Sequence, residues 1–248
     1  MQQLFTGASA LLRGLKLMNT PGLRRFVAIP LAINILLFSA SIWVLVQQFS
    51  PLVDKWISEL PEWLAWLEWL FWLVFAVAAI LLVFYTVSIL ANLIAAPFNG
   101  LLAEAVEKHL TGRPLPGGGS FITVLKQVPE QLFDELRKIA YFLLRAIPLL
   151  ILFWIPVLNL AAPFLWALFS AWMLMVEYGD FPMGNHEIRF ADQRARLRQR
   201  KLLSFGFGGA TLVATMIPVL NFLVMPAAVA GATALWVEQL KQIEPRRK

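Results

Sequence analysis

The chain has 248 residues, of which 59% are hydrophobic, and its mean hydropathy is +0.70. Soluble domains are roughly half apolar, so this composition excludes an ordinary soluble domain and indicates a protein surrounded by lipid. The net charge of +6 suits either an anionic partner or the cytoplasmic flanks of a membrane protein, so the positions of the charges must decide. Because cysteine is absent, the chain can form neither a disulfide nor a thiolate site.

Residues 1–18 are predicted to form an amphipathic helix. Leu4, Ala8 and Leu11 recur at helical spacing, while Arg13 interrupts the apolar run. A signal peptide would need an uninterrupted apolar core, so we expect this helix to lie on the membrane surface instead.

Two long apolar segments, residues 24–46 and 69–98, are predicted to be full membrane spans. No charge occurs between Phe26 and Val46, and at roughly 1.5 Å per residue a helix of this length crosses a hydrocarbon core about 30 Å thick. The second segment is longer, so we expect it to be tilted. Three tryptophans before it are typical of an aromatic belt at a membrane interface: Trp63, Trp66 and Trp69.

Residues 142–176 and 202–237 are predicted to form helical hairpins. Each segment is interrupted near its middle by the phrase Ile-Pro-Val-Leu-Asn, at 155–159 and at 217–221, and proline breaks a helix. Each arm then has about 13 residues and reaches about 20 Å, which is less than the hydrocarbon core. We therefore expect re-entrant hairpins, and the alternative is a pair of short full spans in each segment with local thinning of the bilayer.

The distribution of positive charge predicts the orientation. All but one of the 21 Lys and Arg residues lie outside the 47–68 loop, where Lys55 is accompanied by four carboxylates. Because cytoplasmic flanks collect Lys and Arg, this loop is assigned to the outside. The 99–141 and 177–201 segments and both termini are assigned to the cytoplasm. The whole chain, 1–248, is thus predicted to be one all-α, multi-pass domain of an inner membrane.

The first candidate site lies just before the first span. Thr20 can cap a helix and the proline after it suits a first helical position, which would leave the backbone N–H groups of Gly22, Leu23 and Arg24 free. These donors, together with the guanidiniums of Arg24 and Arg25, would suit a tetrahedral oxyanion. The alternative is that two arginines beside a span only follow the positive-inside rule.

A second candidate site continues the second span into the cytoplasm. It consists of Glu104, Glu107, Lys108 and Arg113, and the spacing puts the first three on one helix face. They could line an entrance or pair with the two arginines of the first site, or they could form a solvated face with local ion pairs. Four asparagines could line a path or bond between helices: Asn34, Asn92, Asn159 and Asn221.

A basic run at 194–201 is predicted to contact anionic lipid head groups. Aromatic residues are too sparse around it for nucleic-acid binding, so we expect no such partner. Neither His109 nor His186 has metal-ligand spacing, and no serine has a nucleophile motif around it. The sequence therefore predicts no metal, no cofactor and no enzymatic activity.

Several phrases together resemble the CysZ family of bacterial sulfate permeases, over nearly the whole chain. They are the paired Ile-Pro-Val-Leu-Asn segments, Pro21 to Arg25, Asn92 to Pro97, Tyr178 to Pro182, and Asn185-His186. The resemblance implies sulfate uptake for cysteine biosynthesis, two long transmembrane helices with two hemi-penetrating hairpins, and a homo-oligomer such as a hexamer. The family's Gly-Leu-Arg sulfate site falls here on Gly22, Leu23, Arg24 and Arg25.

The middle of each full span contains no Asp, Glu, Lys or Arg. A proton relay would be expected to leave such a residue there, so a channel-like route is favoured. We therefore predict a sulfate permease or channel, for which sulfite is a second possible substrate. The competing hypothesis is a non-transporting membrane protein that shapes or senses lipid.

Overall fold

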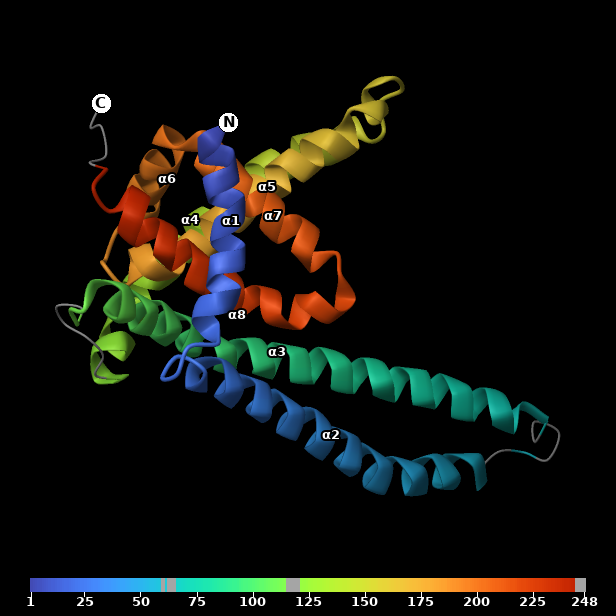
Figure 1. Ribbon diagram of the computed structural model, residues 1–248. Coiled ribbons are helices and arrows are strands. Elements are labelled where there is room, and N and C mark those ends of the chain that lie inside the picture. Colours follow the sequence, from blue (N-terminus) through green and yellow to red (C-terminus); the bar gives the residue numbers. More distant parts are fainter. Residues whose placement is uncertain (59–60, 62–65, 115–120, 244–248) are drawn as a thin grey trace. The chain divides into compact units, whose positions relative to one another are not determined.

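The described part of the chain is built from helices. The computed structural model describes residues 1–58, 61, 66–114 and 121–243, apart from the side chains of 91–97, of 121–134 and of several other helical positions. These residues contain no strand, which confirms the predicted all-α class for them. Figure 1 shows the helices: α1 Gln2–Met18, α2 Arg25–Ser58, α3 Glu68–Thr111, α4 Phe121–Leu152, α5 Ala162–Gly184, α6 Phe190–Gln199, α7 Lys201–Thr215 and α8 Pro218–Leu235. A 3₁₀ turn, η2 (Leu158–Leu160), precedes α5, and a π-helical turn, η3 (Trp236–Leu240), follows α8.

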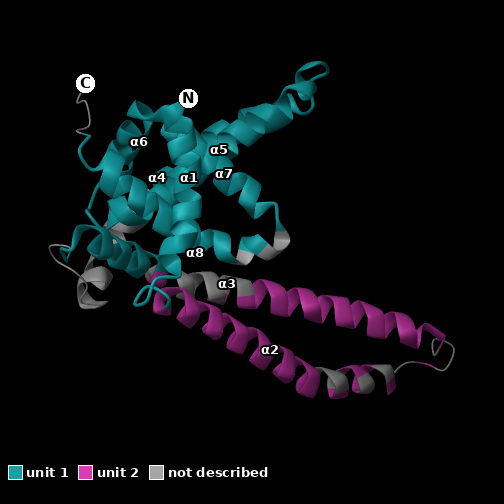
Figure 2. Ribbon diagram, viewed as in Figure 1, with its two compact units in different colours: residues 1–24, 99–248 teal, residues 25–98 magenta. Residues whose placement is uncertain are grey.

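The chain divides into two compact units (Figure 2). Residues 25–98 form one unit, which contains α2 and most of α3, while residues 1–24 and 99–248 form the other. In the unit of residues 25–98, Arg25–Gln48 and Glu68–Val87 are long and apolar enough to cross a membrane, and 0% and 11% of an 18-residue stretch within them is buried. Such exposed apolar helices need lipid around them.

Both long helices extend beyond the predicted spans. α2 continues past residue 46 to Ser58 through Pro51, so part of the predicted outer loop is helical. α3 runs without a break to Thr111 and joins the predicted span to its predicted continuation. Of the three belt tryptophans, Trp66 and Trp69 are exposed and Trp63 lies outside the described residues.

The helices are interrupted where the repeated phrase predicts a break. α4 and α5 are separated by residues 153–161, and α7 and α8 by 216–217. The arms are longer than predicted, because α4 has 32 residues and α5 has 23. At about 1.5 Å per residue these two helices exceed 30 Å, so the argument that the arms are too short to cross a membrane is wrong for α4 and α5. It still holds for α7 and α8, which have 15 and 18 residues and reach less than about 30 Å. A third segment, Leu223–Leu240, is also long and apolar enough to span, but 67% of it is buried.

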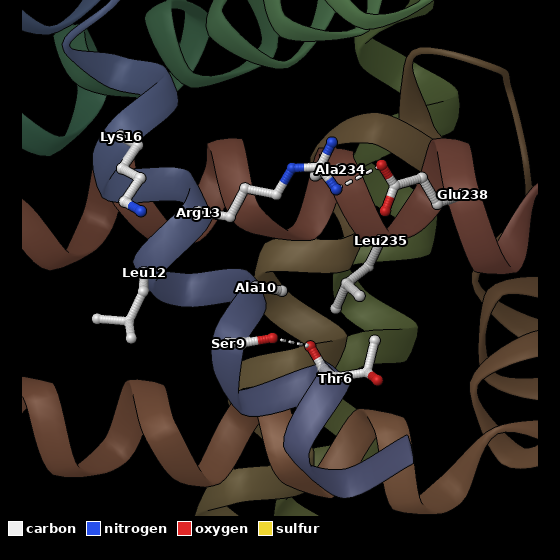
Figure 3. Close-up of a pocket in the computed structure, with 9 residues that line it drawn as sticks. All are labelled: Thr6, Ser9, Ala10, Leu12, Arg13, Lys16, Ala234, Leu235 and Glu238. Atoms are coloured by element: carbon white, nitrogen blue, oxygen red, sulfur yellow. Dashed lines mark hydrogen bonds and ion pairs between the residues drawn. The ribbon is translucent and has the colours of Figure 1, made fainter. Parts of the chain in front are cut away.

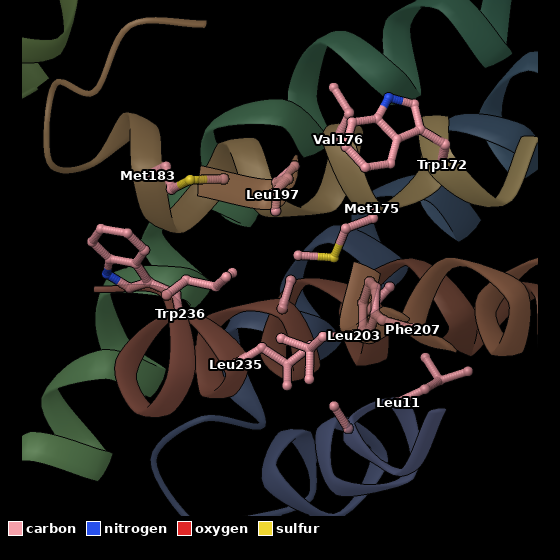
Figure 4. Packing of buried hydrophobic residues seen from close by; sticks show 14 of the residues in the cluster. Leu11, Trp172, Met175, Val176, Met183, Leu197, Leu203, Phe207, Leu235 and Trp236 are labelled. Carbon is pink, nitrogen blue, oxygen red and sulfur yellow. The ribbon is translucent and has the colours of Figure 1, made fainter. Parts of the chain in front are cut away.

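The hydrophobic core of the larger unit lies where α1, α5, α7 and α8 meet (Figure 4). Leu11, Met175, Phe207 and Leu235 pack together there. A Cβ atom at Gly14 would lie 1.9 Å from the Ala227 carbonyl oxygen, so the backbones of α1 and α8 touch. α1 therefore packs one apolar side against α7 and α8 instead of resting that side on lipid.

Candidate functional site

The turn between α1 and α2 holds the first predicted site. Thr20 closes α1, since its N–H donates to the Leu17 carbonyl at 2.9 Å. The N–H groups of Leu23 and Arg24 donate to the Thr20 carbonyl at 3.1 and 3.3 Å. The prediction that these two donors are free is therefore wrong, because Thr20 ends one helix instead of starting the next, and α2 begins only at Arg25.

The same turn presents a polar, positively charged surface. Gly22 adopts φ +90°, a conformation that favours glycine, and no atom lies within 4 Å of the position its Cβ would take. Leu23 is 4% exposed and anchors the turn in the larger unit. The structure therefore leaves the backbone around Gly22 open to a ligand.

Both guanidiniums of the site are accessible. The Arg24 Nε donates to the Asn19 carbonyl at 2.6 Å, which orients the guanidinium, and Arg24 is exposed. The Arg25 guanidinium lies 4.8 Å from the centre of the Phe26 ring. In the described part of the chain, neither arginine forms an ion pair with a carboxylate. Two exposed guanidiniums without a counter-charge can bind an oxyanion.

Glu107, from the second predicted site, has a structural role. Its side chain is 3% exposed and accepts hydrogen bonds from His186 Nε2 at 2.9 Å and Lys241 Nζ at 2.8 Å. Burial by itself raises the pKa of Glu107, but the hydrogen bonds and charges of His186 and Lys241 outweigh it and hold the pKa below its ordinary value. Glu107 thus joins α3, the residues after α5 and the C-terminal segment, and its carboxylate is bound by His186 and Lys241.

The other members of the second predicted site do not gather around Glu107. Glu104 is half-buried, whereas Lys108 and Arg113 are exposed. Among the described residues, none of these three forms an ion pair. Asn34 is half-buried, Asn159 and Asn221 are exposed, and the side chain of Asn92 lies outside the described residues.

The prediction from sequence missed a second buried charge, Lys138. Its Nζ lies 2.9 Å from Glu135, 3.0 Å from Asp180 and 3.2 Å from Glu177. Burial lowers the pKa of Lys138, but the nearby carboxylates of Asp180 and Glu177 raise it by more. The pKa therefore lies above its ordinary value, and the lysine stays charged. This cluster ties α4 to α5, and Asp180 belongs to the Tyr178 to Pro182 phrase, to which sequence gave no role.

Arg196 departs from the predicted lipid-facing basic run. Its Nη1 donates to the carbonyls of Leu240 at 3.3 Å and Lys241 at 3.4 Å, and also to that of Ile243. Its guanidinium lies 5.6 Å from the centre of the Trp236 ring. Arg196 therefore closes the C-terminal end of α8 and η3 and does not face lipid.

A cavity of about 360 Å³ lies between α1 and α8 (Figure 3). Arg13 and Glu238 form an ion pair across it, and both side chains are partly exposed. Its lining mixes polar and apolar groups: Thr6, Ser9, Ala10, Leu12, Arg13, Lys16, Ala234, Leu235 and Glu238. Because Glu238 neutralises Arg13, this cavity offers an anion less net positive charge than the Arg24 turn.

Comparison with known proteins identifies the family of this chain. The family model described as "Sulfate transporter CysZ/Etoposide-induced protein 2.4" matches residues 10–226. The chain belongs to this family. A relative named "Sulfate transporter CysZ" from Pseudomonas fluorescens (strain Pf0-1) is 46% identical over 234 residues, which are 94% of each chain. Its namesake from Pseudomonas paraeruginosa (strain DSM 24068 / PA7) is 44% identical over 234 residues, 94% of this chain and 95% of the relative.

Membership of the CysZ family confirms the resemblance drawn from the short phrases. Together with three segments that are long and apolar enough to span, it identifies a membrane protein. The relatives are named as transporters and not as enzymes, in agreement with the prediction from sequence.

Proposed function

We propose that this protein carries sulfate across the bacterial inner membrane into the cytoplasm, where it supplies sulfur for cysteine biosynthesis. The observation that carries the proposal is the match to relatives named "Sulfate transporter CysZ" over 94% of this chain. The exposed arginine pair adds physical support, because a doubly charged oxyanion needs positive charge that no carboxylate already neutralises.

Gly22, Leu23, Arg24 and Arg25 form the sulfate site in this proposal. Gly22 gives the anion close access to the backbone, and buried Leu23 fixes the turn. The Asn19 carbonyl orients the Arg24 guanidinium, so less side-chain freedom is lost when the anion binds. Arg25 adds the second charge at the first residue of α2.

α2 and α3 form the complete membrane crossings in this proposal, and the α4–α5 and α7–α8 hairpins enter the membrane from the cytoplasmic side. Apolar side chains at and beside the tip of the first hairpin support insertion, with Trp154 88% exposed and Phe164 74% exposed. Both termini are cytoplasmic, in accord with the distribution of Lys and Arg. Copies of the chain assemble into a homo-oligomer, such as a hexamer, around the sulfate path.

The route through the membrane is channel-like. Apart from Arg25 and Glu68 at their first positions, the segments Arg25–Gln48 and Glu68–Val87 contain no Asp, Glu, Lys or Arg. A transporter that couples to protons inside these spans would need such a group. Sulfate then moves down its electrochemical gradient, and the arginine pair retains it at the inner mouth.

Uptake of radiolabelled sulfate into liposomes that contain the purified protein tests the function and the site together. The Arg24→Ala/Arg25→Ala variant is compared with Arg189→Ala/Lys201→Ala, which removes two exposed positive charges elsewhere. We expect uptake by wild type and by the control, and its loss in the site variant. Unlabelled sulfite as a competitor measures selectivity.

If the site variant retained uptake, the result would support sulfate transport by the protein and reject the assigned site. No uptake by folded wild-type protein would reject sulfate transport by this chain alone and favour the lipid-interacting alternative.

A further inference from the structure

Two arginines from different helices share the ring of Tyr141. Tyr141 lies on α4, is buried, and its hydroxyl accepts a hydrogen bond from Trp172 Nε1 at 2.9 Å. The Arg145 guanidinium carbon lies 3.6 Å from the ring centre and that of Arg194, on α6, lies 4.6 Å from it. The two guanidiniums can therefore be no farther apart than the sum of these distances.

Among the residues that the structure describes, no carboxylate neutralises the charge of this pair. Arg145 Nη1 donates to the Tyr141 carbonyl at 3.1 Å, and Arg194 also lies 4.7 Å from the centre of the Phe190 ring. The buried Nε of Arg194 has no hydrogen-bond partner. Within the described part of the chain, neither guanidinium forms an ion pair with a carboxylate.

Lys138, seven residues before Arg145 on α4, is a buried cation with a structural role and serves as a comparison. Three carboxylates surround the Lys138 Nζ. By contrast, burial lowers the pKa of the Arg194 guanidinium; Tyr141 opposes this shift, while the charges of Arg198 and Arg145 add to it, and the pKa lies below its ordinary value. The arginine cluster is thus a place where an added anion would relieve repulsion.

The surroundings of the cluster indicate where that anion comes from. On the same helix, Leu143, Leu144 and Ile147 are exposed, and Leu144 is 73% exposed. Apolar side chains of this size need lipid contact, while Arg198 on α6 is exposed on the polar side. Guanidiniums between an apolar helix surface and a basic segment lie at the level of lipid head groups.

We propose that Arg145 and Arg194 form a binding site for the phosphate group of an anionic phospholipid. The Tyr141 ring holds both guanidiniums in place, the unpartnered Arg194 Nε is a donor for a phosphate oxygen, and the acyl chains lie along exposed α4. This site is distinct from the Arg24 turn and does not depend on sulfate transport.

Native mass spectrometry of the full-length, delipidated protein with added phosphatidylglycerol tests this site. Arg145→Gln/Arg194→Gln should weaken phosphatidylglycerol binding about tenfold or more, as expected for lost charge-assisted hydrogen bonds. Arg189→Gln/Lys201→Gln, which removes the same charge from exposed positions, should weaken it less than about threefold. Equal losses in the two variants would overturn the site.

Arg145→Lys/Arg194→Lys is a control for loss of binding through misfolding, because it keeps the charge and removes the planar guanidiniums. Its thermal unfolding should match that of wild type, and its phosphatidylglycerol affinity should fall between those of wild type and the glutamine variant. Wild-type affinity in the glutamine variant would overturn the proposal.

The same binding measurement is made with inorganic phosphate, sulfate and phosphatidylcholine. Preference for phosphatidylglycerol over all three supports the lipid assignment. Binding of free phosphate or sulfate that the glutamine variant loses, with no preference for lipid, would overturn the lipid assignment and show a soluble oxyanion at the same arginines.

Discussion

The turn at Arg24 and the cluster at Glu107 treat charge in opposite ways. Arg24 and Arg25 are exposed and have no carboxylate partner in the part of the chain that the structure describes. Glu107 is almost fully buried and is bound by both His186 and Lys241. A buried charge is tolerable only when it is paired, whereas an exposed, uncompensated pair is free to bind a ligand. This difference is the reason that the proposal assigns sulfate binding to the arginine pair and a structural role to Glu107.

The largest expected effect is on sulfate uptake. Arg24→Ala/Arg25→Ala should reduce sulfate uptake by about tenfold or more, because charge-assisted hydrogen bonds to the anion are lost. The free energy of unfolding should change by less than about 1 kcal/mol, since both side chains are exposed. Uptake assays and thermal unfolding on the same preparations check both parts. A large loss of stability in this variant would contradict the assignment of a binding role, and not a structural role, to the two arginines.

Gly14→Ala should cause the largest loss of stability. The added Cβ would meet the Ala227 carbonyl oxygen at 1.9 Å, so α1 must move away from α8 at a cost of about 1–3 kcal/mol. Gly209→Ala on α7 is the matched control, because no atom lies within 4 Å of its added Cβ. The control should be neutral or stabilising by up to about 1 kcal/mol. Thermal unfolding in detergent distinguishes them.

Glu107→Ala should destabilise the protein by about 2 kcal/mol. The substitution leaves His186 and Lys241 without their acceptor, and the partial exposure of Lys241 moderates the cost. The variant that remains folded should take up sulfate at nearly the wild-type rate per molecule. A loss of uptake without a loss of stability would place Glu107 in the transport path after all.

The smallest expected effect concerns acidification. Because the pKa of Glu107 is lower in the folded protein than its ordinary value of 4.5, the unfolded state binds more protons between the two values. The stabilisation by Glu107 is therefore complete above pH 4.5 and is lost as the pH falls through the folded value. Unfolding measured against pH should show a weaker acid dependence in Glu107→Gln than in wild type. Identical profiles would reject this contribution.

The sequence predicted the helix breaks because they depend on local chemistry. Proline at 156 and 218 ends or begins a helix whatever surrounds it. The arms were underestimated because only their apolar parts were counted, whereas α4 continues as a helix through charged residues such as Lys138. Local periodicity indicates a helix, but hydropathy alone does not set its ends.

Contacts between distant segments could not be predicted in the same way. Glu107 lies 79 residues before His186 and 134 before Lys241, and no local pattern connects them. The close approach of α1 had a usable signal, since Gly7, Ala10 and Gly14 fall on one helix face as small residues do in packed membrane helices.

The π-helical turn at Trp236–Leu240 makes the end of the chain sensitive to register. The Lys241 N–H donates to the Trp236 carbonyl at 2.8 Å, so this turn holds one residue more than an α-helical turn. Since each residue of an α-helix advances about 100° around the axis, deleting one residue here would swing Lys241 away from Glu107. The spacing between Trp236 and Lys241 thus matters as much as the identity of either residue, and a one-residue deletion would cost more than most substitutions in the same turn.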